Sequence, residues 1–118
     1  RNIMTDTMKA TITDAIDYAR ITRLEYRGLF KRTLGELLSQ MKARSFRDNT
    51  THHALYYLNL LEETYTVAMA RIEKASLEEA CQIMQDLSDQ IGAQVEATSR
   101  LLGIDIATGK ALLKDGKQ

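Results

Sequence analysis

The chain has 118 residues, of which 44% are hydrophobic and 27% charged, and its 16 basic and 16 acidic side chains give a formal net charge of zero. These values predict one globular domain over residues 1–118 and argue against wholesale disorder and against a uniformly cationic binder of nucleic acid. The chain holds no proline and six glycines, so few residues interrupt helices and an all-α fold is expected.

The first predicted helix covers residues 5–45 and is the longest. Its apolar residues recur at steps of three and four between Ile12 and Met41, which is the spacing of one helix face. At about 1.5 Å per residue, an unbroken helix would be about 60 Å long. Gly28 and Gly35 are its weak points, and a break near Gly28 would instead give a closed four-helix bundle.

A second helix is expected over residues 51–74. The preceding run Asp48-Asn49-Thr50-Thr51 consists of residues that favour turns and helix N-caps. From Leu55 to Ile72 the apolar residues again follow a helical spacing. The run therefore predicts a short connection and a new helix start.

The third helix is expected to begin after Ser76 and to end at Gly103. Ser76 and Glu79 have the spacing of a capping box, in which each side chain bonds the other residue's backbone N–H. Glycine commonly ends helices in the left-handed conformation. Asp105 then predicts the cap of a short fourth helix over residues 106–113.

These elements predict an antiparallel bundle of three long helices, the first one longest, with a short C-terminal helix. Because the first helix would outrun the other two, the apolar stripe of Met8, Ile12 and Ile16 would lack a partner within the chain. A second copy is the simplest cover, so we expect a homo-oligomer with coiled-coil-like packing. One cysteine, Cys81, and no membrane-length apolar run predict a cytoplasmic protein without membrane contact.

The charges are strongly segregated. Residues 20–47 hold eight basic and two acidic side chains (8 − 2 = +6), whereas residues 62–89 hold two basic and seven acidic ones (2 − 7 = −5). Within the first block one basic ridge follows a helical spacing and is a candidate binding surface for phosphates or for an acidic protein. It consists of Arg20, Arg23, Arg27 and Lys31. The alternative is that the acidic block neutralises the ridge, which is the outcome we expect.

Arg47 is followed by a polar residue and, after three more residues, by His52. This pattern resembles the Arg–polar–x3–His signature of HEPN-type ribonucleases, which are small helical dimers. The resemblance implies that Arg47 and His52 from two subunits would converge on an RNA phosphate. It covers six residues of the chain and provides a third functional hypothesis, an enzymatic one.

The second helix begins with a cluster of histidine and tyrosine side chains, His52, His53, Tyr56 and Tyr57. No Glu-x-x-His spacing occurs, so the sequence predicts neither a metal site nor another cofactor. Tyrosine is enriched at protein interfaces. The interface candidates are Met8, Ile12, Ile16, His53, Tyr56 and Tyr57.

No motif in the sequence fixes a reaction, and we therefore expect a protein that is not an enzyme. The leading hypothesis is a protein–protein interaction or assembly module that self-associates through helix packing. The first alternative is a small nucleic-acid-associated subunit that lays the basic ridge against a phosphate backbone. The second is the HEPN-like ribonuclease that uses Arg47 and His52.

Overall fold

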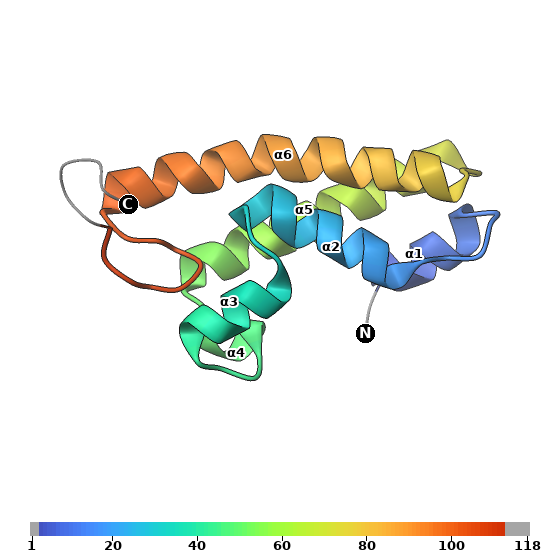
Figure 1. Ribbon diagram of the computed structural model, residues 1–118. Helices are drawn as coiled ribbons and strands as arrows, with labels where there is room; N and C mark the ends of the chain where they lie inside the picture. Colours follow the sequence, from blue (N-terminus) through green and yellow to red (C-terminus); the bar gives the residue numbers. More distant parts are fainter. Residues whose placement is uncertain (1–2, 113–118) are drawn as a thin grey trace.

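The computed structural model describes residues 3–112, and these residues form six helices and no strand (Figure 1). An all-α fold is therefore confirmed. Within the same residues no helix is both long and apolar enough to cross a membrane. The helices are α1 (Ile3–Thr11), α2 (Tyr18–Phe30), α3 (Leu34–Met41), α4 (Phe46–Asn49), α5 (His52–Ile72) and α6 (Leu77–Leu102).

The two longest helices, α5 and α6, form an antiparallel hairpin and match the second and third predicted helices. The hydroxyl of Thr51 caps α5 by accepting from the Ala54 N–H at 3.1 Å. Ser76 and Glu79 form the predicted capping box at the start of α6. Gly103 ends α6 with a φ of 75° in the left-handed region. Local cap chemistry therefore sets the ends of this hairpin.

The predicted first helix over residues 5–45 is wrong, because this region forms α1, α2 and α3. The longest dimension of the molecule is 47 Å, shorter than the expected helix. The first break covers residues 12–17, where two acidic side chains act as caps. Asp17 accepts from the Arg20 N–H at 3.0 Å and starts α2. Asp14 accepts from the Leu77 N–H at 2.8 Å and so ties the break to the start of α6.

A second break separates α2 from α3, three residues beyond the position expected for the alternative fold. Lys31 adopts a left-handed φ of 62°, which ends α2. Thr33 and Glu36 then form a second capping box that starts α3. The chain consequently turns away from the direction of α2, and α3 with α4 lies below the hairpin in Figure 1.

The chain pairs α2 with α6 and α1 with α5, and both pairs run parallel. The direction of the first pair follows from its contacts, which advance together along both helices: Arg20 with Glu78, Leu24 with Ser88, and Gly28 with Gly92. Because α5 and α6 run antiparallel, α1 and α2 run in opposite directions, and residues 12–17 reverse the chain between them.

The closest helix contact lies between α2 and α6, where three small residues meet. A methyl group added at Gly92 would lie 2.0 Å from the Gly28 carbonyl oxygen, and one added at Gly28 would lie 2.0 Å from Ser88 Oγ. The Ser88 hydroxyl lies 3.2 Å from two carbonyl oxygens that can accept its proton, those of Leu24 and Gln85. Glycine is required at both positions because the backbones approach too closely for a Cβ atom.

The apolar face of α1 is buried within the chain. Met8 is 1% exposed and Ile12 is 7% exposed, and Ile16 packs partly buried against the same core. Backbone hydrogen bonds join Thr11 and Thr13 to Ala75 beyond the end of α5. Met8 and Ile12 are therefore not available as interface residues in this fold, and the argument for an oligomer built on them no longer holds.

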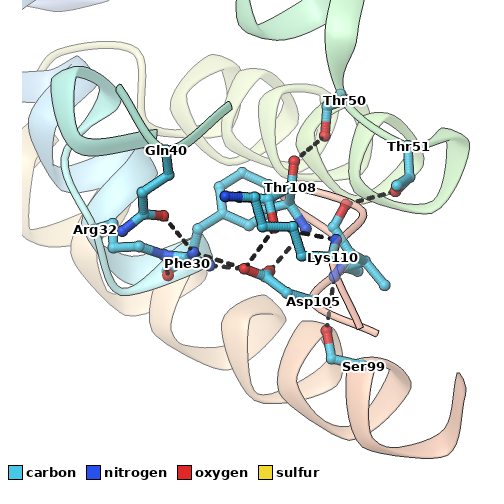
Figure 2. A network of polar contacts seen from close by, with 11 residues as sticks. Phe30, Arg32, Gln40, Thr50, Thr51, Ser99, Asp105, Thr108 and Lys110 are labelled. Atoms are coloured by element: carbon cyan, nitrogen blue, oxygen red, sulfur yellow. Dashed lines mark hydrogen bonds and ion pairs between the residues drawn. The ribbon is translucent and has the colours of Figure 1, made fainter. Parts of the chain in front are cut away.

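The predicted fourth helix is wrong over its described part, residues 106–112, which form turns; residue 113 lies outside the described residues. Asp105 does act as a cap, but Gly109, with a φ of 82°, ends the structure after one turn. Figure 2 shows how hydrogen bonds fasten this segment to α6 and to the connections that precede α3 and α5. Arg32 holds Asp105 at 2.7 and 3.1 Å, and the Thr50 and Thr51 hydroxyls donate to the Ala107 and Ile106 carbonyls, respectively.

We predict that Gly92→Ala lowers the free energy of unfolding by at least about 2 kcal/mol, since the new methyl group overlaps backbone that cannot move alone. Gly35→Ala is the matched control, because a Cβ there meets one atom, Thr33 Oγ1 at 3.9 Å. The control should raise stability by up to about 1 kcal/mol through helix propensity. Urea denaturation of both variants measures the difference, and a Gly92→Ala protein as stable as wild type would contradict the close contact.

Candidate functional site

A groove between α1, α2, α4 and α5 contains the most unusual ionisable group of the described residues. It consists of an outer cavity of about 690 Å³ and an inner one of about 340 Å³. The two cavities share Met4, Arg47 and Glu62, so they are continuous along these side chains. The inner cavity has walls of mixed polarity: Met8, Ile21 and Leu34 line it together with Glu25, Tyr26, Tyr18, Thr5 and Thr22.

An aromatic cluster places Arg47 at the groove. Phe46 is buried, and its ring centroid lies 5.4 Å from that of Tyr26 and 5.2 Å from that of Phe30. The next residue, Arg47, reaches from α4 to α5 and donates to Glu62 Oε2 at 2.8 Å and to Asn59 Oδ1 at 3.1 Å. The guanidinium is thus hydrogen-bonded to two acceptors on α5, one of which is a carboxylate.

Glu25 is buried on α2 without a hydrogen-bond donor. It is 3% exposed, and its Oε2 atom has no hydrogen-bond partner. Burial raises the pKa of Glu25 well above its ordinary value of 4.5, and a hydrogen bond to Glu62 together with the Glu62 charge raises it further, while Arg47 opposes the shift. Burial and the Glu62 charge therefore favour the protonated form of Glu25, which can donate to the Glu62 carboxylate.

The fold also raises the pKa of other groups, Tyr26 and Cys81 among them. Burial, followed by the Glu25 charge, raises the pKa of Tyr26 to about 12, so this ring keeps its hydroxyl proton. Burial raises the pKa of Cys81 on α6, which favours the unreactive thiol over the thiolate. Among residues 3–112 no three His, Cys, Asp or Glu side chains gather to hold a metal ion.

The basic ridge predicted from the sequence is divided in the structure. Arg20 binds Glu78 through two hydrogen bonds of 2.7 and 2.9 Å, which lower the pKa of Glu78. Arg23 and Arg27 are exposed on α2, whereas the Lys31 ammonium donates to the Gly28 carbonyl at 3.0 Å. The two ion pairs Arg20–Glu78 and Arg47–Glu62 join the basic block 20–47 to the acidic block 62–89.

A third ion pair joins Arg32 to Asp105, and its side chains are less exposed to solvent than those of the Arg20–Glu78 pair. This pair was not predicted from the sequence. Its side chains are 25% and 23% exposed. Burial alone would raise the pKa of Asp105, but hydrogen bonds from Arg32, Thr108 and the Ala107 N–H lower it. The pair joins the segment after α6 to the loop before α3, and Thr108 also donates to Asp105 (Figure 2).

The structure does not bring Arg47 and His52 together within one chain. The Arg47 guanidinium lies against Asn59 and Glu62, which follow His52 on α5 by seven and ten residues. At the helical rise, these positions lie about 10 and 15 Å along the axis from His52. The geometry therefore gives the ribonuclease hypothesis no support from a single chain.

The histidine–tyrosine cluster lies at the open end of the α5–α6 hairpin. The hydroxyl groups of Tyr57 and Thr98 are 2.8 Å apart and link the two helices. Tyr56 is 61% exposed and its ring packs edge-on against Tyr57. His53, an interface candidate like these tyrosines, is exposed one turn before Tyr57.

The sequence-based reasoning missed Glu25 as a functional candidate. A signal was present, since Glu25 stands four residues after Ile21 and four before Leu29, on the face that α2 buries. A carboxyl group on a buried face is either paired or functional. Its partner Glu62 could not be found in the same way, because only the folded chain brings α2 and α5 together.

Comparisons with protein-family models, with curated proteins and with solved structures found no match to this chain.

We predict that Glu25→Gln raises the free energy of unfolding at about pH 8 and that the gain disappears toward about pH 4, the ordinary range of a glutamate pKa. The pKa of Glu25 is raised in the folded protein, so between the unfolded and folded pKa values the native state binds more protons than the unfolded state. Stability is then lost as the pH rises through this window. Glutamine avoids the loss because it cannot ionise.

Urea denaturation at several pH values measures this difference. The matched control is Glu96→Gln, which changes an exposed carboxyl group on α6. A difference between Glu25→Gln and wild type that stays constant from low to high pH would contradict a raised pKa for Glu25.

Proposed function

We propose that the protein is a non-enzymatic interaction module that self-associates through the open end of the α5–α6 hairpin. The observation that carries the proposal is the exposure of apolar side chains there: Leu101 is 85% exposed, Leu102 is 45% exposed and Tyr56 is 61% exposed. Clustered exposed apolar side chains mark interaction surfaces.

Helix geometry supports a single surface rather than scattered residues. The bond between Tyr57 and Thr98 fixes the register of the antiparallel pair. His53 lies one helical turn before Tyr57 on α5, and Leu102 lies one turn after Thr98 on α6, so both residues lie on the side where the two helices meet. We call the surface of His53, Tyr56, Tyr57, Leu101 and Leu102 the hairpin-end patch. Packing two such ends together would continue the bundle from one copy into the next.

The nucleic-acid alternative has weaker support. A phosphate-tracking ridge needs free cations, and here Arg20 is paired with Glu78 and the Lys31 ammonium donates to a backbone carbonyl. Arg23, Arg27 and Lys31 remain exposed, which leaves a cationic surface of three side chains of the ridge. Apolar exposure at the hairpin end is therefore the stronger feature.

We predict that wild-type protein sediments at no less than twice its monomer mass of 13.4 kDa at tens of micromolar, and that Leu101→Glu shifts it to monomer. The carboxylate would have to be desolvated at the contact, which costs more than the apolar contact contributes. Sedimentation equilibrium gives the mass of both proteins.

Gln94→Glu is the control, because it adds the same charge to an exposed position of α6, about 10 Å before Leu101 along the helix. It should leave the association unchanged. A monomeric wild-type protein at these concentrations, or equal effects of the two variants, would refute self-association through the hairpin-end patch.

A further inference from the structure

We propose that the inner cavity beside Glu25 binds an organic cation, an ammonium or guanidinium group on an aliphatic stem, with the Glu25 carboxylate as its acceptor. The Glu25 side chain is buried and lines this cavity, and its Oε2 atom has no partner. A buried carboxyl group without a donor is costly. An N–H donor entering the cavity would remove that cost.

The charges around the groove favour a cation. Its two cavities are lined by three carboxyl groups, Glu25, Glu62 and Glu63, and by one guanidinium, Arg47; with Glu25 protonated the ionised groups sum to 1 − 2 = −1. Arg47 is already bonded to Glu62 and Asn59. The described lining therefore leaves an excess of negative charge that its own cation does not balance.

The walls of the inner cavity suit an alkyl chain rather than a bare ion. Met8, Ile21 and Leu34 supply apolar contact for an aliphatic stem, and the Tyr26 ring can contribute cation–π attraction. A metal ion fits poorly, because among residues 3–112 no three His, Cys, Asp or Glu side chains stand together as ligands. The volume of about 340 Å³ can accommodate a ligand of the size of one long basic side chain.

Binding exchanges a proton for the cation. In the empty site Glu25 is protonated and donates to the Glu62 carboxylate. When the cation enters, the Glu25 proton leaves to solvent, and the resulting carboxylate accepts N–H bonds from the ligand. The net charge of the site is unchanged by this exchange. Affinity should therefore rise with pH, by up to about tenfold per pH unit below the pKa of Glu25.

The inference is independent of self-association. The groove is lined by residues of α1, α2, α4 and α5, and none of its described lining residues belongs to the hairpin-end patch. The larger outer cavity provides the way in, and Met4 and Arg47, shared by both cavities, are the side chains that an entering ligand would displace. A Leu101→Glu protein should therefore bind the cation as the wild type does.

Isothermal titration calorimetry with agmatine, an alkylguanidinium, tests the proposal. We expect wild-type protein to bind with a dissociation constant of about 1 mM or tighter at pH 8 and to bind more weakly as the pH falls. Heats measured in buffers of different ionisation enthalpy should show net proton release. Glu25→Gln should bind at least about tenfold more weakly, whereas Glu96→Gln should bind as wild type.

A second titration distinguishes a free amine from the side chain of a protein partner. A short glycine peptide with one central arginine should bind as tightly as agmatine if the natural ligand is a side chain, and much more weakly if the cavity admits a small molecule alone. Either result supports a cation site. No agmatine or peptide binding to wild type at about 10 mM, binding without proton release, or equal binding by a folded Glu25→Gln protein would overturn it.

Discussion

The contact of Gly28 with Ser88 and Gly92 is the constraint on which the rest of the structure depends. It brings the backbones of α2 and α6 so close that neither Gly28 nor Gly92 has room for a Cβ atom, and the side chain at the contact is that of Ser88. Close backbone approach increases the number of dispersion contacts along both helices, and Ser88 adds a hydrogen-bond donor beside the Leu24 and Gln85 carbonyls. Before α2 the chain reverses at residues 12–17, where Asp14 accepts from the Leu77 N–H, and α1 packs on α5 instead of extending α2.

This arrangement also explains the groove. With α2 fixed on α6, its buried face carries Glu25 toward Glu62 on α5. The aromatic contacts of Phe46 hold α4 so that Arg47 bonds Glu62 and leaves Glu25 without a donor. An apolar side chain at position 25 would have packed at lower cost. A carboxyl group retained there is consistent with a ligand role.

The sequence predicted the α5–α6 hairpin well, because its signals are local. Thr51, Ser76 and Gly103 act at the helix ends where their cap chemistry indicated. The same rule could have found the start of α3, since Thr33 and Glu36 have capping-box spacing, as Ser76 and Glu79 do. It was overlooked because the apolar spacing runs unbroken across residues 31–33. Asp14 could not have been found, because its acceptor role depends on the distant Leu77 N–H.

The sequence by itself determined that the protein is all-α, where its hairpin begins and ends, and that basic and acidic charges fall in separate segments. These properties follow from composition, from helix caps and from the sign of charged residues, all of which can be read from short stretches of sequence. The tertiary structure alone decided that α2 lies parallel to α6, that Met8 and Ile12 are buried, and that the Oε2 atom of Glu25 is left without a partner in a cavity. Each of these depends on which surfaces meet across long sequence separations, and helical periodicity specifies a face but not its partner.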